Sequence, residues 1–287
     1  MKVLIVGKNS YIARRTGAWF LNKPVPAKVD FISVRDDSWK QVNLSAFDAV
    51  IYTAAIVHRK DDIPEEVYDA VNAHQPFEFA QTAKAAGIKQ FVFLSTMSVY
   101  GQAKKLPSGN IVDAHTPLKP SHGYGSSKLK GELLIQSLED EQFHVSIIRP
   151  ANVYGKGCKG SYISGFAKIT SLLPRLPRAF EESRQGVLFV DNLAELCWLA
   201  VHSCRSGVYP AQDRTTVSAY DIMRAMADCI CPKKKTLRCE AALKLIQRNA
   251  NVNKLFGGIS YEDDYAKCPL GDYQLVDFHE AIKECFE

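Results

Sequence analysis

The fold of this chain is decided by two stretches, Phe91-Val92-Phe93-Leu94-Ser95-Thr96 and Gly123-Tyr124-Gly125-Ser126-Ser127-Lys128. Four apolar residues followed by hydroxyl side chains are typical of a buried parallel strand with polar groups at its carboxyl end. The second stretch begins a helical pattern, which places Tyr124 and Lys128 on one face of a helix. We therefore expect an α/β fold built on a parallel sheet.

The spacing of Tyr124 and Lys128 has a chemical use. A tyrosine hydroxyl titrates near a pKa of ~10, and an ammonium group one helical turn away favours the phenolate and lowers that pKa. A hydroxyl from Ser95 or Thr96 can then hold the substrate oxygen while Tyr124 transfers its proton. This arrangement suits the oxidation of an alcohol beside a hydride carrier, or the reverse reaction. The alternative is that Tyr124 and Lys128 are ordinary residues of an amphipathic helix.

Three motifs in the same order carry a family resemblance. Ser95-Thr96-Met97-Ser98-Val99-Tyr100-Gly101, Tyr124-x-x-x-Lys128 and Arg149-Pro150-Ala151-Asn152-Val153-Tyr154-Gly155 together resemble the extended short-chain dehydrogenase/reductases. Within these, they are similar to the NAD-dependent epimerase/dehydratase group, which acts on nucleotide sugars. The resemblance implies a Rossmann fold with a doubly wound parallel sheet and a smaller C-terminal substrate-binding lobe. It assigns residues 1–155 and 186–204 to the Rossmann domain, and 156–185 and 205–287 to the lobe.

Composition excludes several other classes of protein. The 287 residues are 46% hydrophobic and 23% charged, as in an ordinary soluble globular protein, and the net charge is only +5. The one dense basic run, Lys233-Lys234-Lys235, is typical of a solvated loop, so no nucleic acid partner is expected. Eight cysteines without a C-x-x-C pair argue against a metal site. We expect no signal sequence, no membrane span and a reduced cytoplasmic setting.

A strand, a tight turn and a helix start the chain, which is the usual cradle for a dinucleotide pyrophosphate. The family pattern is G-x-x-G-x-x-G, and here Gly7 is kept while Ser10 and Ala13 replace the other two glycines. Ser10 adds a Cβ near the phosphate, although its hydroxyl can bond the phosphate instead. Gly7, Asn9, Ser10, Tyr11 and Ile12 are the expected cofactor-binding residues of this turn. The alternative is a purely structural turn.

The second strand, residues 29–34, ends in Arg35-Asp36-Asp37. NAD enzymes usually place an acidic residue here to bind the adenosine ribose, whereas an arginine accommodates the 2′-phosphate of NADP. Arg35 suits NADP, and Asp36 or Asp37 suits NAD, so the sequence leaves the cofactor as NAD or NADP. The next strand, 49–53, follows so soon that little room remains for a crossover helix.

Other site residues follow from the resemblance alone. It assigns Asn43, Ala54, Ala55, Asn72, Pro150 and Val153 to the cofactor, and Asn152 and Arg184 to the substrate. Asn43 takes the place of an acidic residue near adenine, and Asn72 supports the loops beside the cofactor. Asn152 is alternatively a turn asparagine that caps its own backbone. Arg184 is given the grip on the diphosphate because the family's usual arginine position reads Gln185. Asp191 or Asn192 is expected to cap the helix of residues 193–204.

Three reactions use this hydroxyl, tyrosine and lysine. A 4,6-dehydratase needs acidic residues after the threonine, and Met97 and Ser98 stand there instead. A nucleotide-sugar 4-epimerase is favoured by the two motifs that end in VYG. The alternative is a nucleotide 4-keto-sugar reductase like the dTDP-4-keto-rhamnose reductases, favoured by the Gly7-Lys8-Asn9 turn and the missing crossover helix. A non-catalytic dinucleotide-sensing protein fits less well, because Tyr124 and Lys128 are both present.

The resemblance also implies partners. The substrate would be a nucleotide sugar, in a pathway such as polysaccharide biosynthesis. A homodimer is plausible by resemblance, with helices 65–86 and 124–140 of two subunits forming a four-helix bundle. That arrangement requires exposed apolar residues on both helices.

Overall fold

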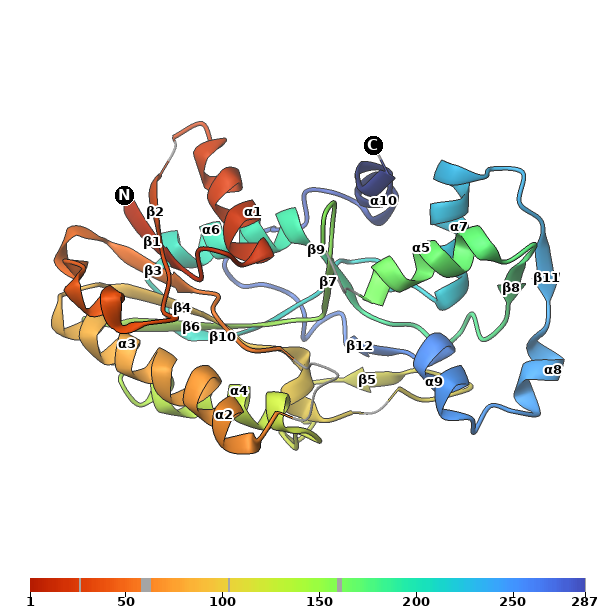
Figure 1. Ribbon diagram of the computed structural model, residues 1–287, viewed down its shortest axis with the longest axis horizontal. Coiled ribbons are helices and arrows are strands. Elements are labelled where there is room, and N and C mark those ends of the chain that lie inside the picture. Colours follow the sequence, from red (N-terminus) through yellow and green to blue (C-terminus); the bar gives the residue numbers. More distant parts are fainter. Residues whose placement is uncertain (26, 58–62, 103, 159–161, 287) are drawn as a thin grey trace.

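The computed structural model describes residues 1–25, 27–57, 63–102, 104–158 and 162–286. A six-stranded sheet in the order β10-β6-β4-β3-β1-β2 forms its centre, and every neighbouring pair is parallel (Figure 1). Its strands are β1 (Lys2–Val6), β2 (Lys28–Ile32), β3 (Ala49–Tyr52), β4 (Gln90–Leu94), β6 (His144–Pro150) and β10 (Gly207–Ala211). The predicted doubly wound parallel sheet is confirmed.

Helices cover both faces of the sheet (Figure 1). α1 (Tyr11–Leu21) and α6 (Val190–Ser203) pack together on one face, and α2 (Glu65–Asp69), η3 (Ala70–His74), α3 (Gln75–Ala85) and α4 (Gly123–Gln136) lie on the other. The inner strands β1, β3, β4 and β6 are mainly apolar because each face of the sheet meets a separate hydrophobic layer. Val3 and Ile5 point into one layer, and Leu4 and Val6 into the other.

The predicted gap in the crossover pattern is present. Between β2 and β3 the chain forms only two short 3-10 turns, η1 (Asp37–Gln41) and η2 (Leu44–Ala46). Trp39 of η1 is 2% exposed, and its ring centre lies 4.8 Å from that of Phe79 on α3. This tryptophan fills part of the space that a crossover helix would occupy.

The helix expected over residues 65–86 is continuous but contains a wider turn. η3 is a single π-helical turn between α2 and α3, a feature frequent near functional sites. The helix ends at its C-cap Ala86, and Gly87 adopts a left-handed φ of +83°. The predicted glycine cap is confirmed.

The second lobe lies beyond the carboxyl ends of the main strands (Figure 1). It contains α5 (Tyr162–Leu172), β8 (Leu176–Arg178), α7 (Ala219–Ile230), β11 (Thr236–Arg238), α8 (Glu240–Lys244) and α9 (Ala250–Phe256). Four strands join it to the Rossmann part as the parallel pairs β7 (Asn152–Tyr154) with β9 (Val187–Phe189) and β5 (Asn110–Val112) with β12 (Ile259–Tyr261). α10 (Phe278–Phe286) returns to α1, where Glu284 pairs with Arg15 at 2.8 Å.

Two boundary expectations are corrected. Residues 205–287 were assigned to the lobe, but β10 lies within that range and pairs with β6 as an edge of the main sheet. The lobe segment therefore starts after Ala211. The helix expected from residue 193 begins earlier, at Val190, and its N-cap Phe189 makes no side-chain capping bond.

Asp191 and Asn192 do not cap that helix, because their side chains form hydrogen bonds with residues of other segments. Asp191 accepts a hydrogen bond from Arg15 Nε at 3.0 Å, and Asn192 donates to Asp213 at 2.8 Å. Along the described part of the chain, no helix has the length and apolar character needed to cross a bilayer.

Candidate functional site

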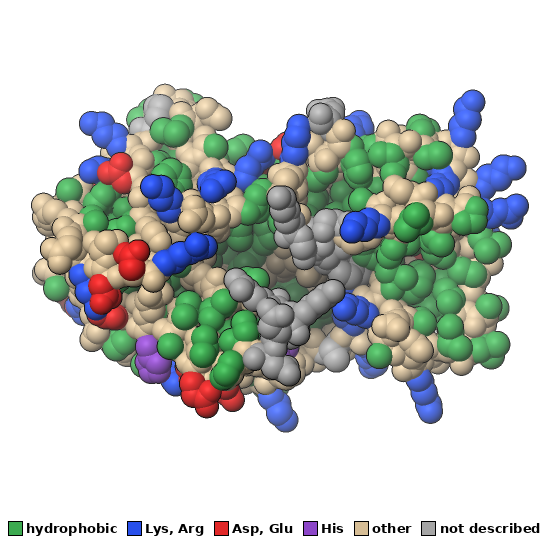
Figure 2. All heavy atoms as spheres, in the orientation of Figure 1, with side chains coloured by type: hydrophobic (Ala, Val, Ile, Leu, Met, Phe, Trp, Pro, Cys, Tyr) green, Lys and Arg blue, Asp and Glu red, His purple; other side chains and the backbone are tan. Residues whose placement is uncertain are grey.

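A cavity of about 780 Å³ opens at the carboxyl ends of β1, β3, β4 and β6. Figure 2 shows this face hollowed between the two parts of the molecule, with apolar side chains inside and basic side chains around it. Thirteen of the expected site residues line the cavity: Gly7, Asn9, Ser10, Ile12, Arg35, Ala54, Ala55, Ser95, Thr96, Tyr124, Lys128, Pro150 and Val153. Ten further lining residues were not anticipated: Lys8, Ser33, Val34, Thr53, Ile56, Val57, Val71, Gln75, Leu94 and Ala151.

The turn after β1 has the form of an anion cradle. Gly7 has a φ of +113°, and a Cβ there would lie 2.6 Å from Thr53 Oγ1, so only glycine fits. Ser10 is the N-cap of α1, and its Oγ accepts a 3.4 Å hydrogen bond from the amide of Ala13. The Ser10 oxygen therefore caps the helix as an acceptor, and its proton can still be donated to a phosphate. The first turn of α1 still presents amide groups and the positive end of its dipole at the cavity.

Tyr124 and Thr96 meet at the inner end of the cavity. Burial raises the pKa of Tyr124 to about 12, and a hydrogen bond with Thr96 acts in the opposite direction. The expected lowering of this pKa by Lys128 is absent from the structure, because removal of the hydroxyl from water outweighs the other contributions. Tyr124 is therefore a neutral proton donor at pH 7. Ser95 is 4% exposed, and its Oγ has no hydrogen-bond partner among the described residues, so it can bond a ligand in the cavity.

Lys128 lies one helical turn from Tyr124 and is 1% exposed. Burial lowers its pKa to about 7, while the nearby charge of Glu132 acts to raise it. Its ammonium group lies 4.0 Å from the centre of the Phe93 ring on β4. A buried lysine with this pKa changes its charge near neutral pH.

Asn72 connects the loop after β3 to α4 through hydrogen bonds. Its amide accepts from Ile56 N and donates to Ile56 O, both at 2.9 Å, and it donates to Ser127 Oγ at 3.1 Å. Ser127 in turn donates to the carbonyl of Tyr124 at 3.0 Å. Gly131 of α4 permits this close approach, because a Cβ at that position would lie only 2.6 Å from Asn72 O. Asn72 is fully buried and does not line the cavity, in keeping with a supporting role.

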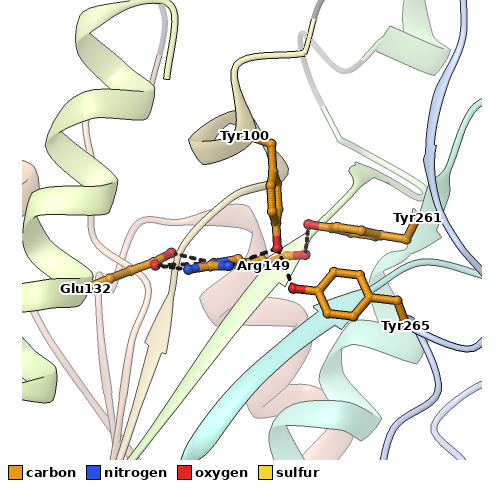
Figure 3. A network of polar contacts seen from close by, with 5 residues as sticks. All are labelled: Tyr100, Glu132, Arg149, Tyr261 and Tyr265. Atoms are coloured by element: carbon orange, nitrogen blue, oxygen red, sulfur yellow. Dashed lines mark hydrogen bonds and ion pairs between the residues drawn. The ribbon is translucent and has the colours of Figure 1, made fainter. Parts of the chain in front are cut away.

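A buried polar network connects α4, β6 and the segments that follow β4 and β12 (Figure 3). Arg149 of β6 donates to Glu132 of α4 through Nε at 3.1 Å and through Nη2 at 2.6 Å. Its Nη1 donates to Tyr100 Oη at 2.8 Å, and Tyr100 Oη lies 2.7 Å from Tyr265 Oη. Burial opposes the charge of Arg149, but the contacts with Glu132 outweigh it and raise the pKa of the guanidinium.

That network joins α4 to the second lobe. Tyr261 of β12 donates to the carbonyl of Arg149 at 2.9 Å, so segments far apart in sequence converge on one residue. Sequence analysis missed the network. The available signal was the presence of two charged residues, Glu132 and Arg149, within an apolar helix face and an apolar strand.

A second cavity of about 200 Å³ adjoins the first on the side of the lobe. Thr96, Pro150 and Ala151 line both cavities, so Thr96 stands at their junction. Asn152 lines this second cavity as expected for a substrate residue, and its side chain also donates to Gly186 O at 3.3 Å.

Lys104 also lines the second cavity, which the sequence did not reveal. Its Nζ donates to Gln185 Oε1 at 3.2 Å and to Lys254 O at 3.3 Å. Burial, followed by the charge of Lys254, lowers the pKa of Lys104 to about 7.

Besides Asn72, three expected site residues lie outside both cavities. Asn43 uses its side chain to accept a hydrogen bond from Ser45 N at 3.1 Å, as the cap of η2. Tyr11 points back towards Gly155, and burial raises the pKa of its hydroxyl. Arg184 faces a different cleft, where it donates to Asp221 at 2.5 Å. These placements correct the roles expected for the three side chains.

Comparison with known proteins identifies the family. The family model described as the NAD dependent epimerase/dehydratase family matches residues 11–212. A UDP-glucose 4-epimerase of Vibrio cholerae is 24% identical over 294 residues, which cover 96% of this chain and 87% of that protein.

Solved structures agree on the fold. A UDP-N-acetylglucosamine 4-epimerase from Bacillus cereus has a TM-score of 0.77 and 17% identity, covering 100% of this chain and 98% of that one. A dTDP-4-dehydrorhamnose reductase from Clostridium acetobutylicum has a TM-score of 0.70 and 19% identity, covering 99% of this chain and 98% of that one. With the family match spanning well over half of its length, the chain belongs to the NAD-dependent epimerase/dehydratase family.

Proposed function

We propose that this protein is an NAD(P)-dependent nucleotide-sugar 4-epimerase whose acid/base group is Tyr124. The observation that carries the proposal is the hydrogen bond between Tyr124, which lines the larger cavity, and Thr96, which lines both cavities. The larger cavity has the glycine turn of a dinucleotide site, and the smaller one has room for a sugar beside it. The similar V. cholerae protein is a UDP-glucose 4-epimerase, which supports the same substrate class here.

The residues present fit a dinucleotide in the larger cavity. The Gly7 turn admits a close anion, and the unpartnered Ser95 hydroxyl offers a hydrogen bond inside. When bound, the nicotinamide supplies hydride acceptance and return. Thr96 would hold the reacting sugar oxygen in place, and Tyr124 would take up and return the proton on that oxygen. Lys128, on the same helix face, lines the larger cavity and would bind the nicotinamide ribose of the dinucleotide.

We also propose that Lys104 contacts the anionic part of the nucleotide sugar. It lines the smaller cavity, and its Nζ reaches the amide oxygen of Gln185, the position where the resemblance places a diphosphate-binding arginine. An ammonium group is a good partner for a phosphate as a compact point charge.

The second candidate is a nucleotide 4-keto-sugar reductase. The neutral state of Tyr124 favours this direction, because reduction of a ketone requires a proton donor. The C. acetobutylicum structure of the same fold is a dTDP-4-dehydrorhamnose reductase.

Retention of the cofactor separates the two candidates. Purified protein is denatured, the released dinucleotide is identified, and the native protein is assayed for 4-epimerisation of UDP-sugars. Tightly retained cofactor together with epimerisation supports the first candidate, because an epimerase regenerates its cofactor in every cycle. Cofactor-free protein that consumes reduced dinucleotide with a 4-keto-sugar nucleotide supports the second. A protein that shows neither of these two activities would overturn the proposal.

A homodimer is proposed through the helices α2 and α4. Val67 on α2 and Leu133 on α4 are 43% and 60% exposed, as a shared helical interface requires. Light scattering at micromolar concentration tests this, and a monomeric mass would contradict it.

A further inference from the structure

The outer end of the larger cavity carries cations where many NAD enzymes carry a carboxylate. Lys8 follows β1, Ser33 and Arg35 follow β2, and all three line the cavity. None of the described lining residues is Asp or Glu. In dinucleotide folds a carboxylate at the end of the second strand bonds the ribose 2′-hydroxyl of NAD, and an arginine there accommodates the 2′-phosphate of NADP.

The two acidic residues next to Arg35 are committed elsewhere. Asp36 caps η1, with its Oδ1 accepting from Ser38 N at 3.0 Å. Asp37 pairs with Lys40 at 3.1 Å, and Lys40 also pairs with Glu78 at 2.9 Å. Both carboxylates therefore belong to the surface around η1, and neither lines the cavity.

Backbone contacts hold the two cationic segments side by side. The carbonyl of Ile32 accepts from the amides of both Gly7 and Lys8, at 2.9 and 3.0 Å. Gln75 of α3 donates to the carbonyl of Val34 at 2.5 Å, which fixes the chain immediately before Arg35. Both cations therefore start from well-fixed backbone on adjoining strand ends.

The chemistry of these groups matches a phosphate monoester. Within the described residues neither Lys8 nor Arg35 forms a salt bridge, and both side chains are exposed, so each can turn to an anion without breaking an ion pair. Ser33 Oγ accepts from the amide of Arg35 at 3.3 Å, which leaves its proton for a phosphate oxygen. A guanidinium binds phosphate in a charge-assisted, bidentate manner, whereas a neutral ribose hydroxyl offers it no charge.

We propose that this chain selects NADP(H) over NAD(H), with Arg35 and Lys8 binding the 2′-phosphate and Ser33 donating a hydrogen bond to it. The inference rests on the proposed function only in taking the larger cavity as the dinucleotide site. It departs from the NAD dependence in the family's description.

Calorimetric titration of the full chain with NADP⁺ and with NAD⁺ tests the selection without any sugar nucleotide. We expect NADP⁺ to bind at least about tenfold more tightly, a preference that falls with added salt because it is electrostatic. The fragment adenosine 2′,5′-bisphosphate should likewise bind more tightly than 5′-AMP.

Three variants locate the selection. Arg35→Ala should weaken NADP⁺ binding about tenfold and change NAD⁺ binding less than about twofold, since only the phosphate contact is lost. Arg35→Asp should reverse the preference, a gain of NAD⁺ selectivity that damaged folding cannot produce. Lys28→Ala is the matched control, because it removes one exposed charge from the other end of β2 and should leave both affinities unchanged.

Equal or tighter binding of NAD⁺ by the unmodified chain would overturn the inference. So would an Arg35→Ala protein that loses affinity for both dinucleotides to the same extent. Selective NADP⁺ binding without turnover of any sugar nucleotide would uphold the inference while the proposed function fails. Turnover of a sugar nucleotide by a chain that prefers NAD⁺ would support the proposed function and overturn the inference.

Discussion

The ammonium group of Lys128 lies 4.0 Å from the centre of the Phe93 ring, in a position where only 1% of the lysine is exposed. The ring is a weak substitute for water, so burial still lowers the pKa of Lys128 to about 7. Burial of Lys128 therefore lowers the stability of the folded protein wherever the lysine is charged in the unfolded chain.

Lys128→Met should make the protein more stable and inactive at once. In the unfolded chain the lysine keeps its ordinary pKa of about 10.5, so between pH 7 and 10.5 the unfolded state binds more protons than the folded state. The stability of the unmodified protein must then rise with pH across this window. At pH 7 the variant should be more stable by several kcal/mol, since a pKa difference of one corresponds to about 1.4 kcal/mol.

Denaturant unfolding of both proteins from pH 7 to pH 10 measures this effect. The advantage of the variant should shrink as the pH rises, because burial penalises the neutral amine of lysine much less than the charged ammonium. A variant that is less stable than the unmodified protein at pH 7 would contradict the assignment.

Tyr124→Phe should lower kcat by about 10²–10⁴, the usual contribution of a positioned acid/base group. The phenyl ring keeps the packing of α4, so dinucleotide affinity should hold within about threefold. The control is Tyr68→Phe, which removes the hydroxyl of the neighbouring tyrosine on α2. A Tyr124→Phe protein with normal kcat would refute the role of this residue.

Replacing one residue of the buried Glu132–Arg149 pair should lower the unfolding free energy far more than replacing both. Arg149→Met or Glu132→Met alone leaves a buried charge without its partner, at a cost of about 3–5 kcal/mol in unfolding free energy. The double variant should recover much of that loss, because neither charge remains. Chemical denaturation of the four proteins gives the coupling, and additive single effects would show that the pair is not coupled.

Lys104→Ala should raise KM for a nucleotide sugar at least about tenfold, in keeping with the loss of a charge-assisted phosphate contact. Dinucleotide affinity should be unchanged, because Lys104 lines only the smaller cavity. Lys105→Ala, which removes an exposed charge from the next residue, serves as the control. An unaltered KM for the Lys104 variant would remove this residue from the substrate site.

The local sequence determined the scaffold of the site. Three features depend only on neighbours within one strand or one helical turn. They are the apolar run before Ser95 and Thr96, the four-residue spacing of Tyr124 and Lys128, and the glycine at position 7. Periodicity and backbone conformation are short-range properties, so these features are readable in one dimension. The three family motifs placed them in a common fold.

Tertiary structure alone decided which charges reach the site. Arg184 and Lys104 are both basic and both near candidate positions, yet pairing with Asp221 holds Arg184 in another cleft while Lys104 borders the smaller cavity. The direction of the Tyr124 pKa shift was also hidden, because it depends on how far the surrounding chain excludes water. Desolvation and ion pairing are sums over neighbours distant in sequence, such as Tyr261 on Arg149, and no local pattern records them.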